Sequence, residues 1–185
     1  MVMEVRRIPN VLVVGTPGCG KSTLCNSVLK RLDDLSSSKS LNGFSMTHLN
    51  IANLIKDKNL YYEWDDEMDC SVYDEELLAE ELSSYDFSKG GFLVEFHSVE
   101  FFEKSQFDCV YVLLTEIEIL ARRLEARDYT ESKVKQNLQC EIFQTCLYDA
   151  YEVFGRSKVK SLNSNTEHDL ENNTELLFNY LTNSS

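Results

Sequence analysis

Residues 11–23 read Val-Leu-Val-Val-Gly-Thr-Pro-Gly-Cys-Gly-Lys-Ser-Thr, a short apolar run that passes directly into a glycine-rich segment. From Gly15 onward this segment matches the pattern G-x-x-x-x-G-K-[ST] at every fixed position, with strand-like residues before it and helical spacing after it. Glycines let backbone N–H groups converge on phosphate oxygens where a Cβ would intrude, and the following helix adds its positive N-terminal end. The segment therefore predicts a loop that holds the phosphates of a purine nucleoside triphosphate with Mg²⁺.

Each position of this loop has an expected role. Lys21 is expected to reach the β- and γ-phosphates, and the Ser22 hydroxyl is expected to hold Mg²⁺. The complete set of expected nucleotide-binding positions in the loop is Gly15, Gly18, Gly20, Lys21, Ser22 and Thr23.

A second ligand for Mg²⁺ is expected at the end of a neighbouring strand, because phosphate-transferring P-loop proteins supply a carboxylate there. Glu95 lies at the tip of a predicted strand over residues 91–96, and the two-residue period of a strand puts His97 on the same face. His97 is therefore a candidate to position water or to orient the metal site. The alternative is a surface histidine that makes only local hydrogen bonds.

Phosphoryl transfer also requires cations on the migrating group. Arg123 and Arg127 are four residues apart on a predicted helix, so they share one of its faces. The alternative is that they complement the negative C-terminal end of that helix. Periodicity alone leaves both interpretations open.

Hydrophobic patterning along the chain alternates between strands and helices, which predicts a parallel sheet covered on both faces. The expected fold is a single α/β domain over residues 1–185 of the P-loop NTPase type, with a central five-stranded parallel sheet. Strands are predicted at residues 10–15, 43–49, 91–96, 108–114 and 157–162. Helices are predicted at residues 21–35, 51–58, 74–82, 115–127 (with Thr115 as N-cap), 131–154 (with a bend at 139–141) and 169–181, between a surface loop at 36–42 and a fraying tail at 183–185.

The net charge of −13 argues against general DNA or RNA binding, which needs clustered Lys and Arg. Eleven acidic residues and no Lys or Arg lie between Glu63 and Asp86. Such a run is usually a solvated face, and the alternative is a docking surface for a basic protein.

Six cysteines are scattered without a C-x-x-C pair, a spacing that fits neither a zinc motif nor a disulfide framework. Reduced thiols in an intracellular protein are the simplest interpretation. No apolar run is long enough for a signal peptide core or a membrane span, so we expect a soluble protein of the cytosol or nucleus that does not bind membranes.

Several segments together resemble one family, the eukaryotic nuclear adenylate kinase isoenzyme six, also described as a coilin-interacting nuclear ATPase and a ribosome assembly factor. The similarity runs from about Pro9 to the last helix. The segments that carry it are Gly15–Thr23, Tyr61–Cys70, Phe92–Phe102, Arg123–Tyr129, Asn137–Phe143 (Asn-Leu-Gln-Cys-Glu-Ile-Phe) and Leu170–Asn173.

The resemblance implies a compact adenylate kinase-like fold with an AMP-binding segment at about residues 50–73 and a short lid at about residues 126–136. Arg127 would close over the ATP phosphates from the lid, and adenine would lie near Ser164 and Asn165. The implied activity is the conversion of ATP and AMP to two ADP, with ATP hydrolysis. The family is also associated with a basic small-subunit ribosomal protein and with 18S rRNA maturation. A monomer located in nucleus and cytoplasm is expected.

Three positions depart from the family pattern. Glu95 stands where the family has Asp, Lys56 where we align an Arg of the AMP segment, and Asp128 where a Gly follows the lid arginine. Glutamate is one methylene longer, lysine lacks the bidentate fork of arginine, and Asp128 adds a negative charge beside the phosphates. These departures favour weaker kinase activity relative to ATP hydrolysis.

Three functions are therefore compared. The first is a kinase that transfers a phosphoryl group from ATP to AMP, and the second is an ATP-dependent assembly factor for a basic ribosomal protein. The third, a small GTPase, is disfavoured because the chain has no N-K-x-D motif for guanine.

Overall fold

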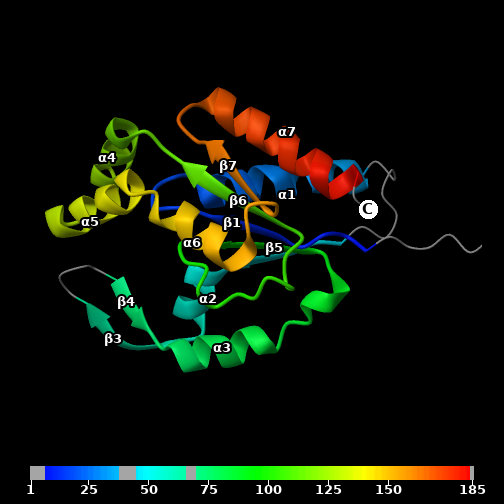
Figure 1. Cartoon of the computed structure of the whole chain (residues 1–185), viewed down its shortest axis with the longest axis horizontal. Helices are drawn as coiled ribbons and strands as arrows, with labels where there is room; N and C mark the ends of the chain where they lie inside the picture. The colour runs from blue at the N-terminus through cyan, green and yellow to red at the C-terminus, as the bar shows by residue number, and fades with distance from the viewer. Residues whose placement is uncertain (1–6, 38–44, 66–69, 184–185) are drawn as a thin grey trace, which may run out of the picture.

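The computed structural model describes residues 7–37, 45–65 and 70–183. Its central sheet has five parallel strands in the order β2-β5-β1-β6-β7 (Figure 1). Their bounds are β1 Val11–Val14, β2 Thr47–Asn50, β5 Phe92–Phe96, β6 Cys109–Leu114 and β7 Val159–Asn163. The predicted five-stranded parallel sheet is confirmed. Residues 43–44 of the predicted second strand, residues 38–42 of the predicted surface loop and residues 184–185 of the predicted tail lie outside the described residues.

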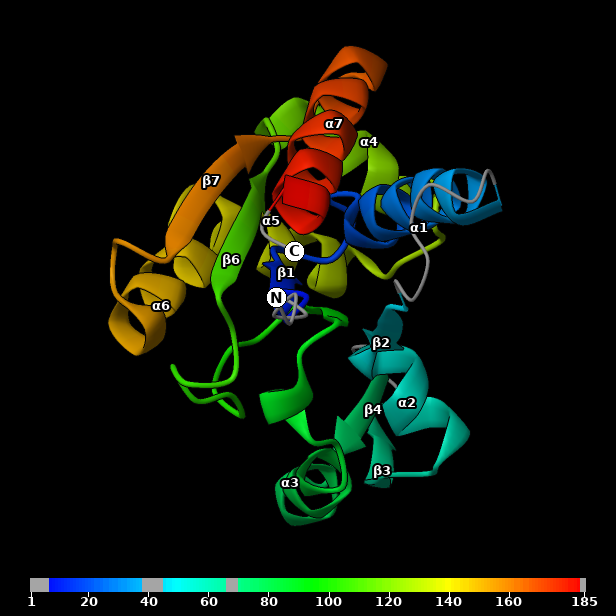
Figure 2. The same ribbon diagram turned by 90° about the vertical axis from the view of Figure 1, so that its right-hand side faces the viewer.

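Helices cover both faces of this sheet, because β1 is apolar on both sides. Val11 and Val13 pack with α1 (Lys21–Ser37) and α7 (Glu167–Asn183). Leu12 and Val14 face the other cluster, which includes residues of α2 (Ile51–Asp57), α3 (Glu75–Ser83) and α6 (Thr145–Phe154). Figure 2 shows α1 and α7 on one side of the strands and α6 on the other. Strands buried on both faces read as continuous apolar runs, which is why they were predictable.

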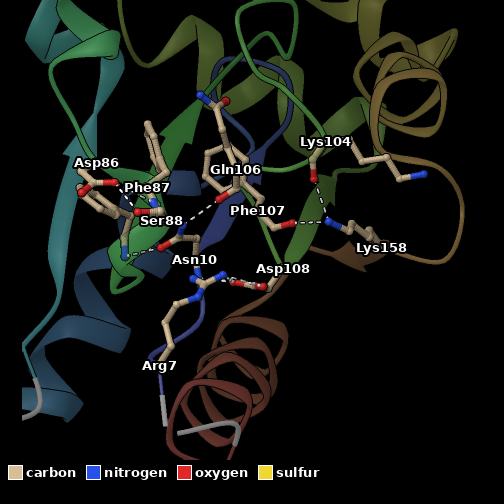
Figure 3. A network of polar contacts seen from close by, with 11 residues as sticks. Arg7, Asn10, Asp86, Phe87, Ser88, Lys104, Gln106, Phe107, Asp108 and Lys158 are labelled. Atoms are coloured by element: carbon tan, nitrogen blue, oxygen red, sulfur yellow. Dashed lines mark hydrogen bonds and ion pairs between the residues drawn. The ribbon is translucent and has the colours of Figure 1, made fainter. Parts of the chain in front are cut away.

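The amino end of β1 is fixed by one buried side chain (Figure 3). The Asn10 amide group donates to the carbonyl oxygens of Phe87 and Gln106, each at 2.7 Å, and its carbonyl accepts from the Phe92 backbone N–H at 3.1 Å. The Asn10 backbone N–H donates to the Asp108 carboxylate at 2.7 Å. Asn10 thereby joins the starts of β1, β5 and β6, and it supplies hydrogen-bond partners to the Gln106 carbonyl and the Phe92 N–H.

Two helix boundaries differ from the prediction. Helix α4 (Ile117–Glu125) has Glu116 and not Thr115 at its N-cap position, and Glu116 makes no side-chain cap hydrogen bond. The Thr115 hydroxyl is directed elsewhere, to the Ser164 carbonyl at 3.4 Å. The predicted helix at residues 131–154 is two helices, α5 (Glu131–Ile142) and α6. The break lies at Gln144, which has φ 52° in the left-handed region, and not at residues 139–141. No glycine or proline marks this break in the sequence.

An antiparallel hairpin was not predicted. It consists of β3 (Tyr61–Asp65) and β4 (Cys70–Tyr73), and it lies inside the expected AMP-binding segment. A short 3₁₀ helix, Phe87–Lys89, follows α3. Part of the acidic run, residues 66–69, lies outside the described residues.

In the part of the chain that the structure describes, no helix combines the length and the apolar character needed to cross a membrane.

Candidate functional site

The glycine-rich loop follows the carboxyl end of β1 and leads into α1. Gly15 has φ 149°, and a Cβ placed on it would lie 2.7 Å from the Leu113 carbonyl oxygen on β6, so a side chain is excluded there. Gly18 and Gly20 also have positive φ, at 93° and 99°. The first helical hydrogen bond runs from the Leu24 N–H to the Gly20 carbonyl at 3.0 Å, so the loop ends at the positive end of α1.

The Lys21 ammonium folds back over this loop. Its Nζ donates to the carbonyl oxygens of Gly15 at 2.7 Å and Thr16 at 3.1 Å. Lys21, Ser22 and Thr23 all line one cavity of about 580 Å³. This volume lies within the range of small-molecule sites.

Glu95 is the next-to-last residue of β5 and is only 2% exposed. Its Oε2 accepts a hydrogen bond from the Ser22 hydroxyl at 2.7 Å. Its Oε1 accepts from the Asn50 amide at 3.0 Å and lies 3.1 Å from the His48 ring nitrogen. Burial alone would raise the pKa of Glu95. The hydrogen bonds from His48 and Ser22, with the charge of Lys21, outweigh burial and lower the pKa below its usual value.

These oxygen atoms fit Mg²⁺. The Ser22 hydroxyl and the ionised Glu95 carboxylate lie 2.7 Å apart, and both are hard oxygen ligands of the kind that Mg²⁺ prefers. Both line the cavity, which leaves room for phosphate oxygens and water. The extra methylene of Glu95 does not prevent its contact with Ser22. Ser22 and Glu95 thus remain our predicted Mg²⁺ ligands.

His97 lies just beyond β5 and lines the same cavity, and its ring is tilted by 51° against Phe96 with ring centroids 4.2 Å apart. The residue is exposed. Desolvation first, and then the charge of Lys21, lower the pKa of His97 from 6.5 to about 4. The imidazole is therefore neutral at pH 7 and can accept a hydrogen bond.

We expect His97 to titrate near pH 4 in the nucleotide-free protein. Because the unfolded histidine takes up its proton near pH 6.5, acidification from about pH 6.5 to about 4 favours the unfolded chain at this residue. Imidazole nitrogen chemical shifts followed by NMR across this range measure the midpoint, and His97→Gln identifies the signal by removing it. A midpoint close to 6.5 would contradict the prediction.

The cavity joins three separate parts of the chain. The predicted AMP-binding segment contributes Asn50, Ala52, Ile55 and Tyr73, and the predicted lid contributes Arg127, Tyr129, Lys133 and Gln136. In Figure 1 the β3–β4 hairpin and α5 lie at the same end of the molecule, the end to which the β6 arrow points. Within the lid, the Lys133 ammonium lies 3.9 Å from the centre of the Tyr129 ring. The structure thus brings the glycine-rich loop and residues of the predicted AMP segment and predicted lid around one cavity.

Arg123 lies apart from this cavity lining. Its guanidinium donates to the carbonyl oxygens of Ser164 at 2.8 Å and Asn165 at 3.1 Å. The Ser164 hydroxyl in turn donates to the Cys19 carbonyl at 2.6 Å. Arg123 therefore holds the loop after β7, the region expected near adenine, against the glycine-rich loop. The predicted contact of Arg123 with the migrating phosphoryl group stays a prediction.

The other two departures from the family pattern are on the surface. Lys56 is exposed in the last turn of α2 and is absent from the cavity lining. Asp128 has φ 56°, which lies in the left-handed region. Glycine adopts this conformation without strain, which is why the family pattern has a glycine at this position.

Sequence reasoning assigned no role to Glu141, which is only 7% exposed. Its carboxylate accepts from the Thr16 hydroxyl at 2.5 Å and from the Thr115 backbone N–H at 2.6 Å, so it ties α5 to the glycine-rich loop and to the end of β6. His48 and Asn50 were also missed. Their alternate spacing on one strand was the available signal.

Comparisons with known proteins agree with this geometry. Residues 11–144 match a family profile described as "AAA domain". The "Adenylate kinase isoenzyme 6 homolog" of Plasmodium falciparum is 38% identical, with 95% of this chain and 97% of the relative covered. The protein of the same name from Dictyostelium discoideum is 36% identical, with 96% and 94% covered.

Solved structures show the fold. Shikimate kinase from Acinetobacter baumannii aligns with a TM-score of 0.58 at 17% identity, covering 95% of this chain and 94% of that one. Shikimate kinase from Bacteroides thetaiotaomicron aligns with a TM-score of 0.56 at 14% identity, covering 94% and 98%. The architecture is therefore that of a P-loop kinase, and the chain belongs to the family of the adenylate kinase isoenzyme 6 homologues.

Proposed function

We propose that this protein is an adenylate kinase that transfers the γ-phosphoryl group of ATP to AMP. The observation that carries the proposal is the single cavity of about 580 Å³ that is lined by the glycine-rich loop, the predicted AMP segment and the predicted lid. A donor and an acceptor nucleotide must meet in one enclosed space for direct transfer. The names of the relatives, adenylate kinase isoenzyme 6 homologues, support this assignment.

In the proposed mechanism the residues position and neutralise the phosphates. Lys21 leaves the carbonyl oxygens of Gly15 and Thr16 to contact the β- and γ-phosphates, and Arg127 approaches them from the lid. Ser22 and Glu95 would hold Mg²⁺, which when bound neutralises charge on the phosphate oxygens. The bond between the γ-phosphorus and its bridging oxygen breaks as an AMP phosphate oxygen bonds to that phosphorus, without a covalent enzyme intermediate.

ATP hydrolysis is proposed at the same site. The neutral His97 imidazole lines the cavity and can accept a hydrogen bond from a water molecule there when AMP is absent. Hydrolysis and transfer then differ only in whether water or AMP supplies the attacking oxygen.

A paired assay on the purified protein with Mg-ATP tests the proposal. One arm measures ADP formation with AMP added, and the other measures phosphate release without AMP. We expect Arg127→Ala to lower kcat/KM for transfer by about 100-fold, the order of effect for one charge-stabilising donor. Arg122→Ala is the matched control, because Arg122 is exposed on α4 and is absent from the cavity lining.

AMP-dependent ADP formation that falls in Arg127→Ala and persists in Arg122→Ala supports the kinase. Phosphate release without any AMP-dependent transfer would overturn it and leave an ATPase.

A second proposed function is compatible with the first: ATP-dependent binding of a basic small-subunit ribosomal protein during 18S rRNA maturation. The observation that favours it is the exposed acidic face of α3, where Glu75, Glu76 and Glu80 are solvent-exposed, on a chain with a net charge of −13. Complementary charge steers and selects partners. With this function we propose a monomer found in both nucleus and cytoplasm.

Pull-down with purified small-subunit ribosomal proteins at moderate salt tests this second function. We expect one of them to be retained, and triple replacement of Glu75, Glu76 and Glu80 by Gln to weaken its retention. Equal retention of every basic protein offered, or of none, would contradict selective binding.

A further inference from the structure

Three donor side chains from three elements converge beside the proposed Mg²⁺ position. They are Cys25 on α1, His48 on β2 and Glu95 on β5, and their ligand atoms all lie within 4.8 Å of one another. Among the residues that the structure describes, no other group of three His, Cys, Asp or Glu side chains meets this arrangement. The three are far apart in the sequence, so cysteine spacing could not reveal them.

Local geometry explains the convergence. Cys25 lies three residues after Ser22 on α1, so both side chains occupy the helix face that meets the end of β5. His48 and Asn50 alternate on β2, and both contact Glu95 Oε1, at 3.1 Å and 3.0 Å. Glu95 is thereby held between the helix and the edge strand.

The donor set is unlike that of a Mg²⁺ site. A sulfur, an imidazole nitrogen and a carboxylate oxygen are the ligands of Zn²⁺ and Co²⁺, whereas Mg²⁺ takes oxygen ligands. In a tetrahedral zinc site nitrogen and oxygen ligands lie about 3.3 Å apart, given metal–ligand distances of about 2.0–2.1 Å. The 3.1 Å separation of His48 Nε2 and Glu95 Oε1 is close to this value, so two of the three ligands are already placed.

We propose that the nucleotide-free protein binds one Zn²⁺-class cation through Cys25, His48 and Glu95, with solvent in the fourth position. His48 is 24% exposed, so the site has access to solvent on this side. The Cys25 thiol is buried, and its proton passes to the buffer as the metal binds.

The site shares Glu95 with the proposed Mg²⁺ position, so the two cations exclude each other. Inhibition of catalysis by Zn²⁺ would follow, and that consequence rests on the proposed kinase function. Metal binding itself does not depend on the proposed kinase function, and it is measured without nucleotide.

Absorption spectroscopy with Co²⁺ as the probe tests the site on the full chain, reduced and free of Mg²⁺ and nucleotide. We expect a thiolate-to-cobalt charge-transfer band that saturates at one equivalent and disappears when Zn²⁺ is added. Cys25→Ser should remove the band. Cys109→Ser is the matched control, because Cys109 is another buried thiol, on β6, and is not part of the cluster.

His48→Gln provides a second variant, at a partly exposed position whose replacement is less demanding for folding than that of the buried Cys25. We expect Co²⁺ affinity to fall by more than about 100-fold, since residues that merely orient a metal ligand are worth about 10- to 100-fold. Circular dichroism confirms that both variants are folded. Absence of the band in the unaltered protein, or an unchanged band and affinity in the folded variants, would overturn the proposal. A failure of kinase activity would not change this readout.

Discussion

Replacing Lys21 by alanine is expected to lower kcat/KM for AMP-dependent ADP formation by at least about 1,000-fold, the upper range for loss of one preorganised charge-stabilising donor. The reason is the position of its ammonium group, which lies over the glycine-rich loop at 2.7 Å from the Gly15 carbonyl. A cation at this place meets the charge that spreads over the migrating phosphoryl oxygens. Coupled detection of ADP with purified protein and Mg-ATP measures the loss.

Lys30→Ala is the control for Lys21→Ala. Lys30 is a lysine of the same helix, α1, but it is exposed and is absent from the cavity lining. Its replacement removes the same charge from the chain without altering the loop, so we expect activity within about twofold of the unaltered protein. Undiminished turnover in Lys21→Ala would exclude the glycine-rich loop as the site of transfer.

Replacing Asn10 by alanine is expected to destabilise the fold by about 2–6 kcal/mol, because each buried polar group left without a partner costs about 1–3 kcal/mol. Two groups lose the Asn10 side chain as their partner, the carbonyl oxygen of Gln106 and the backbone N–H of Phe92. The Phe87 carbonyl loses one of two hydrogen bonds and keeps the one from the Gly90 N–H at 3.2 Å. Asn10 is itself fully buried at the start of β1. A loss of this size is a large part of the stability of a typical domain.

Urea unfolding followed by circular dichroism measures the effect of Asn10→Ala, as a lower midpoint at an unchanged slope. Asn179→Ala is the matched control, since the Asn179 amide makes one exposed contact, to Glu175 at 3.0 Å on α7. We expect that control to change stability by less than about 0.5 kcal/mol. A similarly small change in Asn10→Ala would show that the Gln106 carbonyl and the Phe92 N–H find other partners.

The strands of the sheet were predictable because each is recognisable from the composition of its own residues. Val11–Val14 and Cys109–Leu114 are continuous apolar runs, and Phe92–Phe96 is apolar except at Glu95. Strands buried on both faces favour this composition. The glycine-rich loop was predictable for a related reason. Its glycines adopt positive φ angles that depend on residue type and position, so their spacing indicates the loop geometry.

The β3–β4 hairpin was not predictable in the same way. Strand β3 carries two acidic residues, and neither strand is a continuous apolar run. Of the hairpin, Tyr73 lines the cavity together with residues far away in the sequence. The N-cap position of α4 was also not predictable from local sequence. The Thr115 hydroxyl contacts the distant Ser164 carbonyl, and Glu116 occupies the N-cap position.

By itself, the sequence determined the parallel α/β fold, the loop from Gly15 to Thr23, and Glu95 and His97 at the end of the neighbouring strand. Only the tertiary structure decided which side chains surround Glu95. Ser22 and Cys25 come from a helix, and His48 and Asn50 come from an edge strand. Their meeting depends on the strand order, which places β5 between β2 and β1, and on the register that pairs Asn50 with Glu95. Contacts of this kind join distant segments, and no local pattern of residues records them.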